Sequence, residues 1–235
     1  MTGVAVAAEQ AAPTNPRDLR LVGKGLLALI VPLGPFAVAV LRYVLPYDTT
    51  ATPEQVSQGV IAQPGRESLV LWLGLVAAFT LVPAVLAIGR LTRGRSPRLT
   101  LAALALLVPG YLAVPWMIGL DQLLWTGARA GLPAEALTGL ATSTHPTVGI
   151  AEGVFVLGHV VGTILLGVAL WRSRAVPRWA ALITIISQPL HFTAAVLVGS
   201  HPLDLVAWSL NGIGFAVAAL AILRLPADDW DLPPT

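Results

Sequence analysis

Residues 148–171 read VGIAEGVFVLGHVVGTILLGVALW. This run contains one carboxylate, Glu152, one histidine, His159, and neither lysine nor arginine. A helix needs about 20 consecutive, predominantly apolar residues to cross the hydrocarbon core of a bilayer. The run therefore predicts a transmembrane helix, and it places two polar side chains within that helix.

Five other stretches are similarly long and apolar, and they cover about residues 24–46, 67–90, 100–125, 178–199 and 203–224. The chain is 56% hydrophobic and 11% charged, with a mean hydropathy of +0.78, whereas soluble domains carry about a quarter charged residues. We therefore predict an all-α, polytopic integral membrane protein, a bundle of six transmembrane helices over residues 24–224. A loosely ordered cytoplasmic tail is expected at residues 1–23 and a cytoplasmic C-terminal tail at residues 225–235. Prolines inside the spans predict several kinked helices; they are Pro32, Pro35, Pro83, Pro109, Pro115 and Pro189.

The distribution of lysine and arginine predicts the orientation. All but three of the 14 Lys and Arg residues fall in the N-terminal tail, in the loops around residues 90–98 and 172–178, or at Arg224. Loops rich in these residues stay in the cytoplasm, so both termini are predicted to be cytoplasmic. The Arg- and Ala-rich composition is typical of a bacterium with a GC-rich genome, and we expect the cytoplasmic (inner) membrane. Trp208, near the outer end of the sixth span, is expected at the membrane interface.

Several classes of function are excluded by what the sequence lacks. The chain has no cysteine, which excludes disulfides, thiolate metal sites and iron–sulfur clusters. Its net charge is only +2 and its basic residues lie in separate loops, so nucleic acid is not an expected partner. The expected partners are the lipid bilayer and a small-molecule or lipid ligand, and nothing indicates an oligomer.

Polar side chains inside a bilayer are costly, so those present are candidates for function. They are Asp121, Glu152, His159, Gln188, His191, Asp204 and Asn211. Counting 1.5 Å per residue from the outer span ends places His159, His191 and Asn211 in one layer about 12–15 Å deep. We interpret these residues as an outward-facing polar pocket between the third and sixth spans. It would handle a proton, a small molecule or a lipid, in transport or in intramembrane catalysis.

Within this pocket, His159 and His191 are expected to be the central proton-handling groups, because histidine titrates near neutral pH. Glu152 lies two turns from His159 on the same helix face and is expected to stabilise its imidazolium. The other polar residues are expected to line the pocket: Gln188 and Asn211 as orienting groups, Asp121 and Asp204 at the mouth.

Three alternatives remain open at this stage. One is a haem b protein, with His159 and His191 as axial ligands at matched depth and small residues, Gly158 and Gly162, making room for the porphyrin. A second is a metal site of His159, His191 and Glu152, although the two-turn spacing opposes their convergence. The third is a non-catalytic assembly subunit with a structural polar cluster, in which the GxxxG patterns at 149–153 and 158–162 serve packing or oligomerisation.

A weak internal repeat relates the second and third spans to the fourth and fifth. RGRSPR at residues 93–98 resembles RSRAVPR at residues 172–178, and each final arginine precedes a proline, Pro109 or Pro189, by eleven residues. In this alignment Tyr111 corresponds to His191. Duplication and chance similarity between two cytoplasmic turns both explain the pattern.

The predicted topology is tested by reporter fusions after Ser96, after Gly131 and at the C-terminus. We expect cytoplasmic signals from the first and third fusions and an extracytoplasmic signal from the second, since the arginine-rich turns should stay inside. An extracytoplasmic signal at Ser96 would overturn the topology.

Overall fold

The computed structural model describes residues 19–230, and every regular element within them is a helix. Six helices are long and apolar enough to cross a membrane. They are α1 (Arg20–Val44), α3 (Pro64–Arg93), α4 with α5 (Pro97–Leu112 and Val114–Arg129), α7 (Pro146–Ser173), α8 with η1 (Arg178–Phe192 and Thr193–Val198) and α9 (His201–Arg224). The predicted fold class, an all-α bundle of six spanning helices, is confirmed. The N-terminal tail was expected to cover residues 1–23. Its part up to Asp18 lies outside the described residues, and α1 begins within it, at Arg20.

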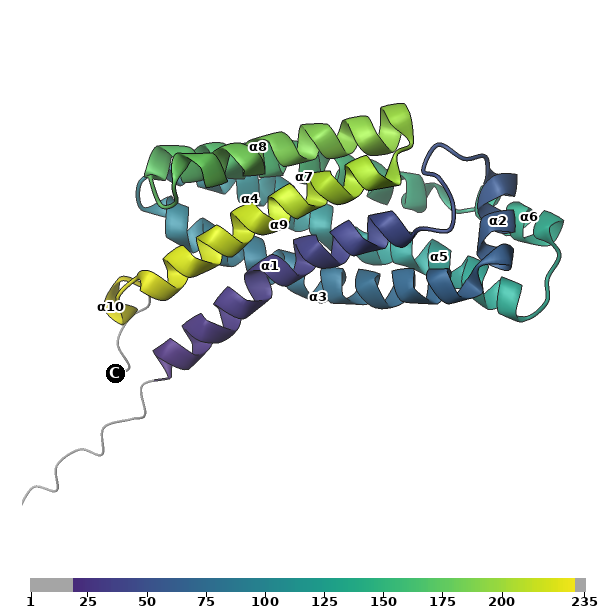
Figure 1. Cartoon of the computed structure of the whole chain (residues 1–235), viewed down its shortest axis with the longest axis horizontal. Coiled ribbons are helices and arrows are strands. Elements are labelled where there is room, and N and C mark those ends of the chain that lie inside the picture. The colour runs from purple at the N-terminus through teal and green to yellow at the C-terminus, as the bar shows by residue number, and fades with distance from the viewer. Residues whose placement is uncertain (1–18, 231–235) are drawn as a thin grey trace, which may run out of the picture.

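The spanning helices form an elongated bundle in which α1 packs along both α3 and α9, while α4 packs along α7 (Figure 1). The interior is filled by fully buried apolar side chains, among them Leu81, Leu107, Leu166 and Phe215. The outer surface is also apolar. Large exposed side chains on it include Trp72, Phe79, Leu101, Leu157 and Leu197. A soluble monomer rarely exposes so much contiguous apolar surface, so these side chains indicate that lipid is the solvent.

Two spans are interrupted shortly after a proline. Pro109 lies inside α4, which ends at Leu112; Pro189 lies inside α8, which ends at Phe192 and continues as the π-helix η1. Proline lacks a backbone N–H and its ring pushes away the carbonyl of the preceding turn, which loosens the helix there. The two interruptions occupy equivalent positions in the sequence repeat described above. Prolines in α1 and α3 leave those helices continuous.

Short helices that the sequence did not predict cover the ends of the bundle. At one end, α2 (Pro53–Ala62) packs against α6 (Ala134–Thr142), and the N-terminus of α2 is closed by a capping box of Thr52 and Gln55. At the other end lies α10 (Ala227–Trp230), as Figure 1 shows. Trp230 is only 5% exposed and its carbonyl accepts a hydrogen bond from Arg90 Nη2 at 2.9 Å. Within the expected C-terminal tail, residues 227–230 therefore pack against the bundle.

Glycines allow α4 and α7 to approach closely. A Cβ atom built on Gly158 would lie 2.6 Å from the carbonyl oxygen of Leu106 and 2.8 Å from the Cα of Gly110. By contrast, a Cβ on Gly153, five residues earlier on the same helix, would meet nothing within 4 Å. Of the two GxxxG patterns in α7, the one at 158–162 therefore packs inside the chain.

We predict that Gly158→Ala destabilises the protein by about 1–3 kcal/mol, because the backbone atoms that its methyl group meets cannot rotate away. Gly153→Ala is the matched control and should leave stability unchanged or slightly raised, since alanine favours the helix. Thermal unfolding of the purified variants in detergent measures both effects. Equal effects of the two substitutions would contradict the packing described here.

Candidate functional site

Two histidines that the sequence singles out, His159 of α7 and His191 of α8, lie in contact. Their ring centres are 5.2 Å apart, and both rings pack against the indole of Trp208, with centre distances of 5.9 and 5.3 Å respectively. His159 is 1% exposed, His191 8% and Trp208 0%. Trp208 thus lies in the interior of the bundle instead of at the interface expected for it. The three rings form one wall of a cavity.

A chain of polar contacts connects His191 to the first span. Asp204 Oδ1 lies 2.5 Å from His191 Nδ1, and Asp204 Oδ2 accepts a hydrogen bond from Arg42 Nε at 2.5 Å. The side chain of Asp204 is only 2% exposed, so its charge is balanced by Arg42 and not by water. Asp204 therefore lies inside the protein, and not at the pocket mouth as the sequence suggested, because Arg42 of α1 pairs with it there.

The contacts of His191 indicate where its proton lies. Nδ1 is within hydrogen-bonding distance of two groups, the Asp204 carboxylate and, at 3.0 Å, Trp208 Nε1. An imidazole nitrogen either carries a proton and donates it or accepts through its lone pair. The carboxylate can only accept and the indole N–H can only donate, so Nδ1 of a neutral ring satisfies one of the two contacts and not both. The contact with Asp204 is the shorter one and involves a charged group, so we assign the Nδ1 proton to it, which leaves the Trp208 N–H without an acceptor at Nδ1. The lone pair then resides on Nε2, and His191 lines the cavity, so Nε2 is the atom that can accept a proton there.

His159 is held differently. Its Nδ1 lies 2.6 Å from the carbonyl oxygen of Phe155. The Phe155 ring stacks on the imidazole with ring centres 4.1 Å apart, and Nε2 is buried with no hydrogen-bond partner among residues 19–230.

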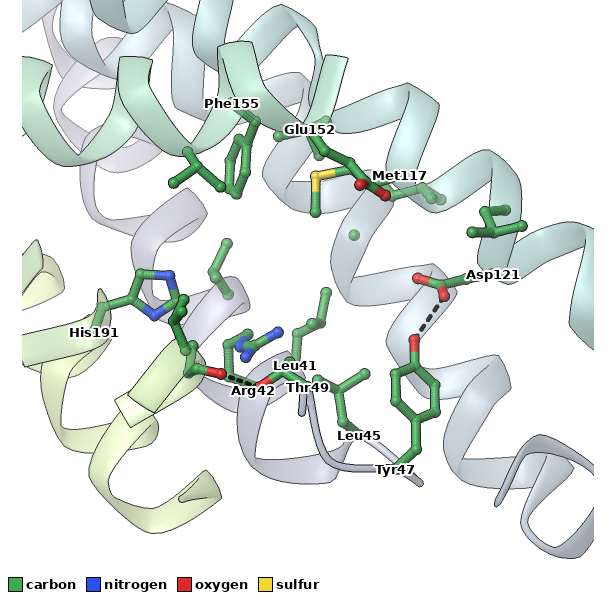
Figure 2. Close-up of a pocket in the computed structure, with 18 of the residues that line it drawn as sticks. Leu41, Arg42, Leu45, Tyr47, Thr49, Met117, Asp121, Glu152, Phe155 and His191 are labelled. Atoms are coloured by element: carbon green, nitrogen blue, oxygen red, sulfur yellow. Dashed lines mark hydrogen bonds between the residues drawn. The ribbon is translucent and has the colours of Figure 1, made fainter. Parts of the chain in front are cut away.

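The expected pairing of His159 with Glu152 is not observed. Glu152 is exposed and forms no hydrogen bond or ion pair within the described residues. Phe155 occupies the intervening turn of α7 and covers the imidazole, while the Glu152 carboxylate lies beside Met117 (Figure 2).

The cavity has a volume of about 680 Å³, which is in the range of sites for small molecules. Its walls are largely apolar, and its polar groups lie in two places. Figure 2 shows His191 and Arg42 on one side and Glu152 and Asp121 on the other. The predicted location between the third and sixth spans is too narrow, since the first two spans also line the cavity. They contribute Val38, Leu41 and Arg42 from α1, Leu45 directly after it, and Gly74, Ala77 and Leu81 from α3.

The second polar group of the cavity is built around Asp121. Its Oδ1 accepts a hydrogen bond of 2.7 Å from the hydroxyl of Tyr47, which lies in the loop after α1 (Figure 2). Burial raises the pKa of Tyr47 well above its usual value, and the negative charges of Asp121 and Glu67 raise it further. Tyr47 therefore remains a neutral hydrogen-bond donor at physiological pH, and Asp121 forms no ion pair within the described residues.

Gln188 and Asn211 do not belong to this cavity. Both are fully buried one turn deeper than His191 and Trp208, neither lines the cavity, and their side-chain atoms have no hydrogen-bond partner in the described part of the chain. The structure therefore does not show them orienting either histidine. A buried amide without partners costs about 1–3 kcal/mol, which makes this layer a place for internal water.

The histidine geometry does not fit a bis-histidine haem. Imidazoles that bind one metal from opposite sides, with bonds of about 2 Å, keep their ring centres about 6 Å apart, and the porphyrin plane must pass between them. The rings of His159 and His191 are closer than this, and Trp208 packs against both. Within residues 19–230, moreover, no three His, Cys, Asp or Glu side chains are grouped closely enough to hold a metal ion.

Three residues of the site were missed at the level of sequence: Arg42, Tyr47 and Glu67. The position of Arg42 could have indicated a site residue, because it lies near the end of the predicted first span, where a charged side chain needs a partner. The sequence does not say which acidic residue that partner is. Tyr47 and Glu67 flank the outer loop, where nothing in the sequence distinguishes them from solvated residues.

The fold and the cavity define a multi-pass helical membrane protein with an internal, partly polar pocket. Residues 21–225 match the family called DUF4386, a domain of unknown function, and the chain belongs to this family. No curated protein and no solved structure matches the chain. Membership of this family therefore does not indicate which activity the site has.

The importance of the buried pair is tested by a double-mutant cycle with Arg42→Met and Asp204→Asn. Each single variant leaves one buried charge without its partner and should lose about 3–5 kcal/mol of stability. The double variant should lose much less than the sum of the two. Thermal unfolding in detergent provides the measurement. Asp228→Asn, which removes an exposed pair with Arg20, is the control and should change stability little. Additive losses in the double variant would mean that the two residues do not act as a pair.

Proposed function

We propose that this protein binds a small amphipathic molecule in the cavity and exchanges a proton with it, or with the outer solution, through His191. The observation that carries the proposal is the position of the His191 ring. One nitrogen contacts Asp204, and the ring lines a cavity large enough for a small molecule. A carboxylate that orients an imidazole in this way prepares the opposite nitrogen to take up and release a proton.

The composition of the cavity walls supports an amphipathic ligand. Apolar side chains such as Leu41, Ile118 and Val160 make up most of the lining, and the polar groups are few and separated. Sites of this composition bury the apolar body of a ligand and use the polar groups to orient it. A fully polar solute would leave most of this lining without a suitable contact.

The interrupted helices favour transport over catalysis in a fixed site. The α4–α5 interruption lies at Ala113, next to Val114, which lines the cavity, and η1 contributes Ala195 and Val196 to the lining. Discontinuous helices of this kind form the binding sites of many secondary transporters, where the loosened segment allows one part of the bundle to move. π-helical turns likewise occur often at functional sites.

We further propose that the cavity opens to the outside of a bacterial cytoplasmic membrane, with both chain termini in the cytoplasm. The arginine-rich turns after α3 and α7 lie at the end of the bundle near α10, and the cavity lies toward the end covered by α2 and α6 (Figure 1). The positive-inside rule assigns the first end to the cytoplasm.

Cysteine labelling tests whether this cavity is hydrated and open outward. The chain has no cysteine, so each introduced cysteine is the only thiol in the protein. Met117→Cys and Val160→Cys, which place thiols in the cavity, should react with a membrane-impermeant maleimide added to intact cells, because a thiol reacts as the thiolate in water. Leu166→Cys, fully buried and outside the lining, should not react.

Two results would contradict the proposal. Labelling of the cavity positions only after the membrane is opened would place the cavity on the cytoplasmic side. A failure of both to label, with the protein folded, would show a dry cavity that no soluble molecule enters.

A further inference from the structure

The charges that line the cavity are unbalanced. The lining contains one guanidinium, that of Arg42, and three carboxylates, those of Asp48, Asp121 and Glu152. Arg42 is already compensated by Asp204, and Asp48 lies 3.2 Å from the imidazole of His201. The two remaining carboxylates form no ion pair within the described residues. Asp121 is bonded to the neutral hydroxyl of Tyr47, and Glu152 forms no ion pair.

A third carboxyl group interacts with Asp121. Glu67, in the first turn of α3, is 0% exposed, and neither of its carboxyl oxygens has a hydrogen-bond partner among residues 19–230. It interacts electrostatically with Asp121 and Tyr47, and Asp121 in turn interacts with Glu152. A buried carboxyl group without any partner is costly. An incoming positive charge near Asp121 would stabilise all three groups.

The arrangement of these carboxylates selects the kind of cation. They are not grouped tightly enough for three of them to hold a metal ion in the described residues. The neighbouring side chains are instead suited to an organic cation, whose charged group carries carbon substituents. Glu152 and Asp121 lie on one side of the cavity beside the thioether of Met117 and the ring of Phe155, as Figure 2 shows. Aromatic faces and thioethers accommodate the weakly hydrated groups of organic cations.

We propose that the ligand of this cavity is an organic cation, whose ammonium-type group binds between Asp121 and Glu152 while its apolar part lies along the walls shared by α1, α3 and α7. The inference rests on the proposed function, since it names the class of molecule that the cavity takes. It also gives the two polar sides of the cavity separate tasks. The acidic side attracts the ligand, and His191 on the opposite side exchanges the proton.

The test uses the full chain in lipid nanodiscs and two fluorescent probes of opposite charge. Ethidium is an aromatic cation, and 8-anilinonaphthalene-1-sulfonate is an aromatic anion. We expect ethidium to bind with higher affinity than the anion, measured by fluorescence anisotropy against empty nanodiscs. Asp121→Asn and Glu152→Gln should each weaken ethidium binding about tenfold, because each removes one attractive charge in a partly desolvated site.

Two further variants serve as controls. Glu135→Gln removes an exposed carboxylate of α6 that does not line the cavity, and it should leave ethidium binding unchanged. Val160→Trp fills part of the cavity and should abolish binding of the cation. Should Asp121→Asn fail to fold, Glu152→Gln alone decides, because its side chain is exposed and makes no contact that the fold needs.

The outcomes separate this inference from the proposed function. If a probe binds and Val160→Trp blocks it, but neither carboxylate substitution weakens ethidium, the cavity binds small molecules and the cationic preference is wrong. If neither probe binds, or binding survives Val160→Trp, both the inference and the proposed function are overturned.

Discussion

The ion pair between Arg42 and Asp204 is the interaction on which the site depends. It joins the first span, α1, to the last, α9, at a place where the Asp204 side chain is 2% exposed and that of Arg42 is 16% exposed. Removing either partner leaves a buried charge, so the pair fixes the two helices together at this depth. The same carboxylate fixes His191 through its other oxygen. One buried pair thus joins the two helices and orients the His191 ring.

Close packing and open space lie side by side in the middle of the bundle. Gly158 lets α7 meet the backbone of α4 at Leu106 and Gly110, and its neighbour His159 lines the cavity of about 680 Å³. The helix interruptions after Pro109 and Pro189 also border this cavity, since Val114 and Ala195 belong to its lining.

The sequence predicted the six spans because bilayer thickness fixes the length of an apolar helix, and it placed His159 and His191 at one depth because the helical rise is constant. It did not show how the spans are arranged around the bundle, so the pairing of Arg42 with Asp204 could not be read from it. Periodicity put Glu152 and His159 on one face but did not show that Phe155 would cover the imidazole. Loop residues such as Tyr47 carry no sequence signal, because their position depends on how the loop folds back over the bundle.

The most direct test of the account is the protonation state of His191. Nitrogen-15 NMR of the protein labelled at histidine is practicable, since the chain has four histidines and the signal of His191 can be assigned by its loss in one substituted variant. The account predicts a neutral ring protonated at Nδ1, with an Nε2 resonance that shifts when a cavity ligand binds. A ring protonated at Nε2, with Nδ1 accepting from Trp208, would contradict it, because the atom facing the cavity would then have no lone pair to accept a proton.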